Sequence, residues 1–221
     1  ALFLEYVEGL TLEDIIAVRR SQPGLLMERL ALAARLLAKL HTGATRSDRE
    51  PSFEPGAAYA RKVIDNLARH GVLQDEPLVR DALYDLVDRW ANRPEMAAFA
   101  PVLIHGDPTT TNFVFPDPGK AVALDWERLK IADPAADLGR LMAEVSHSVV
   151  RHGGNAEEAE AFVQHLSQSY ALSVPRSWDR DAIGQRARFY RASSTLRIAR
   201  NGWLSRLERT ALVAQAMALL V

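Results

Sequence analysis

The sequence has 221 residues, with 27 basic and 28 acidic side chains, so its formal net charge is −1 at pH 7. A chain so close to neutral gives no reason to expect nucleic acid or a membrane surface as a partner. It contains no cysteine, which excludes disulfides and thiolate metal sites and fits the reducing cytoplasm. The length suits one large domain or two small ones.

The chain opens inside an apolar run, Leu2 to Val7, which predicts a short buried strand. The run has no basic segment before it and is too short for a signal peptide or a membrane span. Because it also lacks an initiator methionine, we expect further sequence upstream of Ala1. Thr11, followed three residues later by Asp14, predicts the start of a helix that extends to about Arg20.

Most of the remaining chain has helical periodicity. Helices are predicted over about 25–40, 59–69, 78–90, 134–150 and 155–171, with two more in 177–220 that are separated near Asn201-Gly202. Asp133 is a predicted N-cap, with Pro134 at the first helical position. Residues 44–58 are predicted to be a loop because they contain Pro51, Pro55 and Gly56.

Three short apolar runs interrupt the helical pattern, at 102–104, 113–115 and 121–124. Pro116-Asp117-Pro118-Gly119 separates the last two runs and predicts a β-hairpin. The expected fold class is therefore α+β, mainly helical with a small hairpin.

The densest group of polar residues lies between these strands. Asp107 and Asn112 lie in the loop after the first strand, and Asp125 ends the hairpin. A hairpin brings the three residues to one end of a small sheet. Phosphoryl transfer needs such a set, because one carboxylate must accept the proton of the attacking hydroxyl, and an amide oxygen and a second carboxylate must hold Mg²⁺ against the phosphates.

These residues also carry a family resemblance. His105-Gly106-Asp107 with Asn112, followed by the hairpin and Asp125-Trp126-Glu127, resembles the catalytic and metal segments of aminoglycoside phosphotransferase-like kinases. The resemblance implies the C-terminal lobe of a protein-kinase-like fold and the use of ATP and Mg²⁺. It also implies that Asp107 is the catalytic base and that Asn112 and Asp125 are Mg²⁺ ligands, as in the related protein kinases.

The opening segment agrees with this resemblance. Leu4 to Gly9 is similar to the hinge between the two lobes of these kinases. The resemblance implies that the Glu5 carbonyl and the Val7 amide bind adenine, and that Val114 forms the floor beneath the base. It further implies that Asp137 braces the catalytic loop through backbone hydrogen bonds.

The likeness extends over about residues 1 to 145 and implies a hinge at 1–10 and a helical lobe over 11–221. Within the lobe, 101–127 would hold the catalytic loop and metal hairpin, and 134–221 the acceptor-site region. The family's phosphate-covering loop and phosphate-binding lysine precede the hinge. None of Lys39, Lys62, Lys120 and Lys130 lies there, so we expect the N-terminal lobe to be missing from this chain.

Several residues near the motif have an ordinary structural interpretation. His105 is predicted to be buried and to support the loop by hydrogen bonding. Trp126 is predicted to pack in the core, with the lining of a ligand pocket as the alternative. Glu127 could touch substrate or form a surface salt bridge. His147 and His152 are predicted at the surface, because the six histidines show no zinc-binding spacing.

The C-terminal helices are rich in arginine. Nine arginines face only Asp179, Asp181 and Glu208, so the segment carries +6: Arg176, Arg180, Arg186, Arg188, Arg191, Arg197, Arg200, Arg206 and Arg209. The favoured interpretation is a solvated face that pairs with acids elsewhere. The alternative is a basic wall in the acceptor pocket, which would suit a neutral or anionic acceptor better than a polycationic antibiotic.

The function expected from these observations is ATP- and Mg²⁺-dependent phosphorylation of a hydroxyl on a small molecule, by a cytoplasmic enzyme. The alternative is a pseudokinase-like module that binds nucleotide or acts as a scaffold without turnover. A metal-dependent hydrolase that uses the same carboxylates is a third possibility. The sequence names neither the acceptor nor the oligomeric state.

Overall fold

The computed structural model describes residues 6–43, 48 and 50–221. Its helices are α1 (Leu12–Ala17), α2 (Pro23–Gly43), α3 (Glu54–Arg69), α4 (Pro77–Ala91), α5 (Pro134–Arg151), α6 (Ala156–Ser173), α7 (Arg180–Ala199) and α8 (Arg206–Leu220). Its strands are β1 (Leu10–Thr11), β2 (Val102–Ile104), β3 (Phe113–Phe115), β4 (Val122–Ala123) and β5 (Lys130–Ala132). The predicted α+β class, mainly helical, is confirmed.

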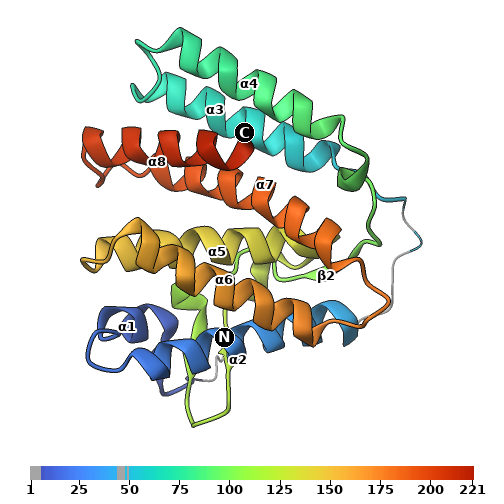
Figure 1. Cartoon of the computed structure of the whole chain (residues 1–221), viewed down its shortest axis with the longest axis vertical. Coiled ribbons are helices and arrows are strands. Elements are labelled where there is room, and N and C mark those ends of the chain that lie inside the picture. The colour runs from blue at the N-terminus through green and yellow to red at the C-terminus, as the bar shows by residue number, and fades with distance from the viewer. Residues whose placement is uncertain (1–5, 44–47, 49) are drawn as a thin grey trace, which may run out of the picture.

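The helices are stacked in pairs (Figure 1). The α1–α2 pair lies at one end of the molecule, α5 and α6 lie next to it, α7 and α8 follow, and α3 and α4 form the far end. One hydrophobic core joins α1, α2, α5 and α6 with β3 and β4, and a second joins α3, α4, α7 and α8. Tyr190 on α7 packs against both cores. The α5–α7 contact therefore links the two halves.

That contact is close because a glycine lies in it. A side chain at Gly139 on α5 would collide with the backbone of α7 at Ala187 and Arg191. Both helices carry residues at the candidate site, so this close contact fixes the position of the site residues on α5 relative to α7. Among the described helices, none is long and apolar enough to cross a lipid bilayer.

Two small antiparallel sheets lie beside the helices. In the first, β3 pairs with β1 on one edge and with β4 on the other, with Phe113 opposite Ala123. This confirms the predicted hairpin. In the second, β2 pairs with β5, with Ile104 opposite Lys130. The sequence did not predict β5, because a strand of three residues is too short to show an alternation of apolar and polar side chains.

The predicted strand from Leu2 to Val7 lies mostly outside the described residues, and its last two residues, Tyr6 and Val7, are not in a strand. The segment that does pair is Leu10–Thr11. Thr11 then caps α1 in a capping box with Asp14, which confirms the predicted helix start.

Two predicted helix limits are wrong. The helix after Thr11 ends at Ala17 and not at Arg20. The chain turns there, and the buried Arg19 side chain binds Glu158 and two backbone carbonyls. Helix α3 begins at Glu54, inside the predicted loop, because Pro55 occupies the first turn, where a proline is tolerated.

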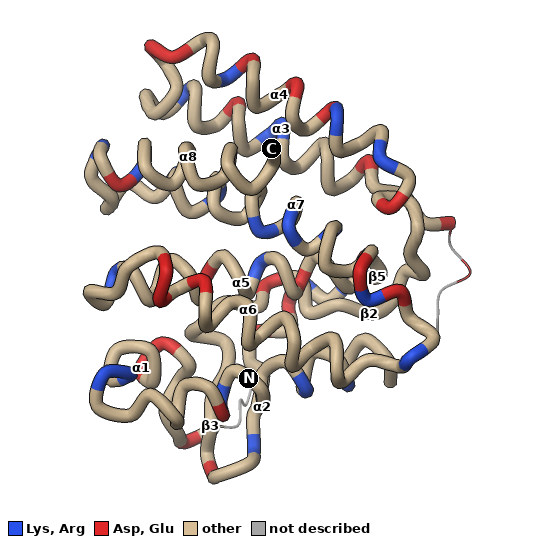
Figure 2. Tube along the Cα trace, viewed as in Figure 1, with Lys and Arg blue, Asp and Glu red and all other residues tan. Residues whose placement is uncertain are grey.

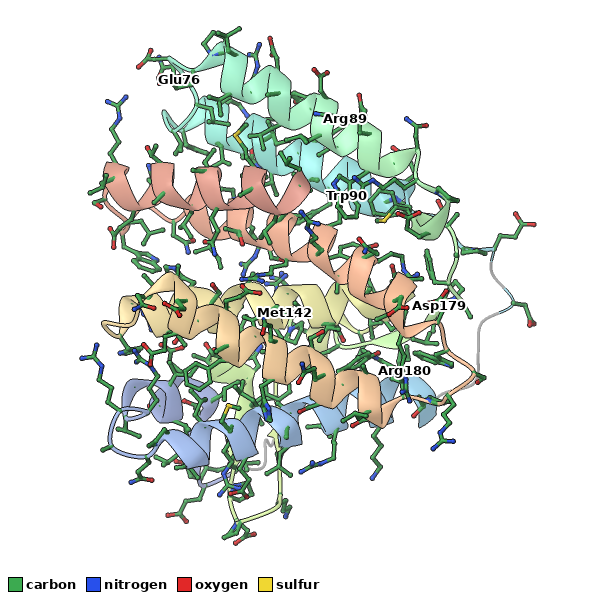
Figure 3. The ribbon with its side chains drawn as sticks, in the orientation of Figure 1. Glu76, Arg89, Trp90, Met142, Asp179 and Arg180 are labelled. Atoms are coloured by element: carbon green, nitrogen blue, oxygen red, sulfur yellow. The ribbon has the colours of Figure 1, made fainter. Side chains whose placement is uncertain are left out.

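Trp90 fixes the packing of the α3–α4 pair against α7 and α8 (Figure 3). Its side chain is fully buried and its indole N–H donates to the Leu220 carbonyl at 2.8 Å. Replacing Trp90 with Ala is expected to reduce the free energy of unfolding by about 3–5 kcal/mol, because the change leaves a cavity. Urea unfolding measures this loss. The exposed Trp203 is the matched control, and Trp203→Ala should change stability by only about 0.5 kcal/mol. Equal effects of the two changes would show that Trp90 does not hold this interface.

Three of the nine C-terminal arginines pair with acids elsewhere, as predicted, but inside the fold and not on a solvated face. Arg186 is buried against Asp133 at 2.8 Å, and Arg191 is buried against Glu160 at 2.7 Å. Arg197 pairs with Glu144 on α5. These side chains connect α7 to α5 and α6, so much of the positive charge is used inside the fold.

Candidate active site

The loop after β2 is held by a carboxylate on α5. Asp137 accepts the backbone N–H of His105 at 2.7 Å and of Gly106 at 2.9 Å, which confirms the brace predicted for it. Asp137 itself is buried and bonds Nε2 of His41 at 3.0 Å, and Nδ1 of His41 bonds the Tyr170 hydroxyl at 2.8 Å. The loop is therefore anchored to α2, α5 and α6.

Gly106 makes the turn that presents Asp107. Its φ of 83° lies in the left-handed region, and a side chain there would collide with the Arg128 carbonyl. The backbone of the Asp107 loop therefore lies directly against the segment after the hairpin.

His105 joins the loop to the hairpin. It is fully buried and its Nε2 donates to the Leu124 carbonyl at 2.8 Å, while its Nδ1 accepts the Asp107 N–H at 3.3 Å. These two bonds require the neutral tautomer protonated at Nε2. The predicted supporting role of His105 is confirmed.

The hairpin brings Asn112 and Asp125 together. Leu124, which precedes Asp125, donates its N–H to the Asn112 carbonyl at 2.9 Å. The Asn112 side chain donates Nδ2 to the Asp107 carbonyl at 2.9 Å, so its amide oxygen is left as an acceptor. Asp107, Asn112 and Asp125 thus belong to one bonded unit of backbone.

Asp125 has an unusual backbone. Its φ of 63° and ψ of 59° are left-handed, and it is the one non-glycine residue with positive φ in the described part of the chain. Such strain costs of order 1–3 kcal/mol and persists where the surroundings fix it. Its side chain is exposed. An amide oxygen and a carboxylate are oxygen ligands of the kind that Mg²⁺ takes, so the two residues fit that ion.

Asp107 lies between two arginines. Its Oδ1 pairs with Arg140 on α5, and its Oδ2 lies 3.2 Å from Arg128. Asp107 is about 9% exposed, and among the described residues its Oδ1 has no hydrogen bond besides that ion pair. Both oxygens of the carboxylate therefore face cations.

Glu13 on α1 supports the same loop from its other side. Its carboxylate accepts the hydroxyls of Thr110 at 2.6 Å and Ser148 at 2.7 Å, bonds Nε2 of His152 at 2.8 Å, and pairs with Arg151. Burial raises the pKa of Glu13, but these hydrogen bonds and the Arg151 charge outweigh that effect and lower the pKa to about 2. Glu13 thus links α1 and α5 to the catalytic-type loop.

The lowered pKa predicts a pH-dependent contribution to stability. Because the folded pKa of about 2 lies below the ordinary 4.5, the contribution is complete above pH 4.5 and disappears as the pH falls toward 2. We expect about 1–2 kcal/mol at pH 7, since solvent screens part of the interaction.

The measurement is the free energy of unfolding of the wild type and of Glu13→Gln between pH 7 and pH 3, with the exposed Glu157→Gln as control. The difference for Glu13 should shrink as the pH falls, whereas that for Glu157 should stay near zero. A difference that does not depend on pH would show that the Glu13 charge does not matter.

The residues predicted to contact adenine are only partly described. Glu5 lies outside the described residues. Val7 is half-buried, and Val114 is 3% exposed in the central strand β3. Their predicted roles stay predictions.

Two predictions for neighbouring side chains are wrong. Trp126 is 37% exposed and lies on the His105 ring at 4.6 Å, so it is not a core residue. Its indole N–H donates to the Ala123 carbonyl, which keeps it at the surface of the hairpin. His147 and His152 are half-buried, because His147 lies against Trp203 and His152 bonds Glu13.

A cavity of about 700 Å³ lies next to Asp107, between α3, β5, α5 and α7. Gly106 and both arginines that pair with Asp107 line it. The remaining polar lining includes Tyr59 and Lys130. A molecule of the size of a hexose fits in this volume.

Sequence reasoning missed the residues that surround Asp107. Arg128 and Arg140 contact Asp107 from 21 and 33 positions further along the chain (128 − 107 and 140 − 107), and Glu13 contacts Thr110 across 97 positions. Arg140 and Glu13 occupy ordinary helical positions, and no local pattern distinguishes them from surface charges.

A braced Asp107 loop and a hairpin that presents an amide and a carboxylate are features that a phosphoryl-transfer site needs. The family model described as "Phosphotransferase enzyme family" (APH) matches residues 1–183. The chain therefore belongs to this phosphotransferase family, which confirms the resemblance inferred from the motifs.

Solved structures share the fold. The chain superposes on a glucosamine kinase with a TM-score of 0.64 at 14% identity, covering 98% of this chain and 58% of that one. It superposes on an ethanolamine kinase of Plasmodium vivax with a TM-score of 0.59 at 16% identity, covering 99% and 67%. An ADP-bound aminoglycoside phosphotransferase gives 0.51 at 14% identity, covering 98% and 70%. The chain thus spans little more than half of the length of the glucosamine kinase. The search of curated protein sequences found no match to this chain.

Proposed function

We propose that the protein is an ATP- and Mg²⁺-dependent kinase that phosphorylates a hydroxyl group of a small molecule. In this proposal Asp107 is the catalytic base, and Asn112 and Asp125 hold Mg²⁺. The hydrogen bonds that join the Asp107 loop to Asn112 and Leu124 carry the proposal, because they hold the three residues as one unit. Membership of the phosphotransferase family supports the reaction type.

Each of these residues has a separate role in the proposed reaction. The Asp107 carboxylate orients the acceptor hydroxyl and accepts its proton as the oxygen forms a bond to the γ-phosphorus. The bond between that phosphorus and the β–γ bridging oxygen breaks, and ADP leaves with the electron pair. Mg²⁺, when bound, neutralises charge on the phosphates. Arg128, three residues after Asp125 and exposed, can reach the same phosphates.

The remaining assignments follow the family resemblance. Residues 1–10 would form the hinge, in which the Glu5 carbonyl and the Val7 amide bind adenine above Val114. Residues 11–221 would form the C-terminal lobe, with 101–127 as the catalytic and metal segment and 134–221 as the acceptor-site region. The fold neighbour with bound ADP supports nucleotide use. We place the protein in the cytoplasm, where ATP and Mg²⁺ are supplied.

A non-catalytic, pseudokinase-like module is not favoured. Such a module has no need to keep a carboxylate of the base type, two side chains of the metal-ligand type and a brace for their loop, and the hydrogen bonds of Asp137 to His105 and Gly106 supply such a brace.

The test is ³¹P NMR of the full-length protein with ATP, Mg²⁺ and a panel of small hydroxyl compounds. A kinase gives a phosphate ester of one acceptor together with ADP. ADP with inorganic phosphate only, at a rate that no acceptor changes, would instead support the metal-dependent hydrolase and contradict the proposal.

A further inference from the structure

The two arginines beside Asp107 indicate what charge the acceptor carries. In this structure both carboxylate oxygens of Asp107 face guanidinium groups, one from Arg140 and one from Arg128. If Asp107 is the base, the attacking hydroxyl must approach one of these oxygens. At least one guanidinium must then lose its partner.

The two arginines differ in how easily they can move. The Arg128 side chain is 57% exposed on the segment after the hairpin, so it can turn toward solvent or toward the nucleotide phosphates. The Arg140 side chain is only 12% exposed and projects from the middle of α5, which is fixed against α7. Arg140 is therefore the cation that stays in place when the hydroxyl arrives.

Among the described residues, Asp107 is the one acid that pairs with Arg140. Glu144 lies one turn along α5 and already pairs with Arg197. Burial lowers the pKa of Arg140, and the nearby Arg197 charge lowers it further, yet a guanidinium stays protonated. The Arg140 Nε is buried and, within the described residues, has no hydrogen-bond partner. A buried guanidinium with an unpaired N–H is destabilised, so a further anion beside Arg140 would be favourable.

The lining of the cavity next to Asp107 also has more basic side chains than acidic side chains that are free to pair with them. Arg128, Lys130 and Arg140 line it, together with the hydroxyl-bearing residues Tyr59, Ser193 and Ser194. Two acids also line it, but Asp133 pairs with Arg186, and Asp137 holds the loop and His41. Glu50, at an exposed position, is the remaining acid in the lining. Figure 2 shows basic segments on α7 and charged segments on the neighbouring α5.

We propose that the acceptor is an anionic hydroxyl compound, such as a sugar acid or a sugar phosphate, whose carboxylate or phosphate binds Arg140 while its hydroxyl replaces the Arg128 guanidinium at Asp107. A planar guanidinium binds either group through two parallel hydrogen bonds, which would also fix the position of the hydroxyl. The same charges disfavour an amino-sugar or choline-like cation. This inference rests on the proposed kinase function and adds the charge of the substrate.

The test uses the full-length protein, Mg²⁺-ATP and four compounds of one size: glucose, glucosamine, gluconate and glucose 6-phosphate. ADP release gives kcat/KM for each compound, and calorimetry gives its affinity for the protein saturated with Mg²⁺-ADP. We expect gluconate or glucose 6-phosphate to exceed glucose by at least about 10-fold and glucosamine by more. Which of the two is better distinguishes a carboxylate from a phosphate acceptor.

Variants of Arg140 test the contact itself. Arg140→Gln should lower kcat/KM for the preferred anion by about 10- to 100-fold, mainly through KM, and should lower that of glucose by a clearly smaller factor. Arg140→Lys should recover part of the loss, because it restores the charge. Arg89→Gln, on the outer face of α4 in Figure 3, is the helical control and should change nothing. Far-ultraviolet circular dichroism and the thermal midpoint show whether each variant is folded.

The failures of the two proposals are distinguishable. Turnover of glucose or glucosamine at rates above those of both anions, or failure of both anions to bind, would overturn the anionic acceptor and leave the kinase intact. An unchanged anion preference in folded Arg140→Gln would overturn the role of Arg140. Absence of Mg²⁺-dependent ATP binding and of ADP formation under all conditions would instead contradict the kinase proposal.

Discussion

Replacing Asp107 with Asn in the full-length protein is expected to lower the rate of phosphoryl transfer by about 10²- to 10⁴-fold, the range for loss of a general base. The amide keeps the size of the side chain but cannot accept the hydroxyl proton. Nucleotide affinity should change little, because Asp107 is not one of the proposed metal ligands. The measurement is steady-state ADP formation with a working acceptor, together with nucleotide binding by calorimetry.

Asp117, at an exposed position in the hairpin turn, is the matched control for this change. Asp117→Asn should retain the wild-type rate. The assignment of Asp107 would be wrong if Asp107→Asn also retained more than about half of the rate, since positioning alone would then explain catalysis.

Replacing Asp125 with Ala is expected to remove the Mg²⁺-dependent part of nucleotide affinity, a loss of at least about 100-fold if the carboxylate binds the ion directly. Binding of ADP is measured with and without Mg²⁺. In the wild type Mg²⁺ should tighten binding, and in the variant it should have no effect.

The backbone of Asp125 complicates this change, because Ala in the left-handed region is strained. Asp125→Asn provides the control, since Asn tolerates that region and keeps the size of the side chain but loses the charge. It should fold like the wild type and still bind Mg²⁺-ADP weakly. Full Mg²⁺-dependent binding by a folded Asp125→Asn would contradict the role of this carboxylate as a ligand.

Local sequence patterns predicted the parts of the site that depend on neighbouring residues. The turn between two apolar runs predicted the hairpin, and its observed register brings the residue before Asp125 to Asn112. The Asp133–Pro134 pair predicted the start of α5, and Asp133 indeed caps it. The brace by Asp137 came from the family resemblance, and the structure confirms it with two hydrogen bonds.

Contacts between distant segments could not be predicted in this way. Arg140 reaches Asp107 only because α5 packs beside the loop, and Glu13 reaches Thr110 only because α1 folds onto α5. The buried pairing of Arg186 with Asp133 likewise depends on the position of α7 against α5. A single sequence shows such residues as ordinary helix charges, so the C-terminal arginines looked like a solvated face.

The most direct measurement is a crystal structure of the full-length protein with Mg²⁺ and a non-hydrolysable ATP analogue. We expect one Mg²⁺ with the Asn112 amide oxygen and an Asp125 carboxylate oxygen among its ligands, at about 2.1 Å, and the Asp107 carboxylate facing an open position beside the γ-phosphate. A nucleotide bound elsewhere, or a metal that neither Asn112 nor Asp125 contacts, would contradict the proposed phosphoryl-transfer centre.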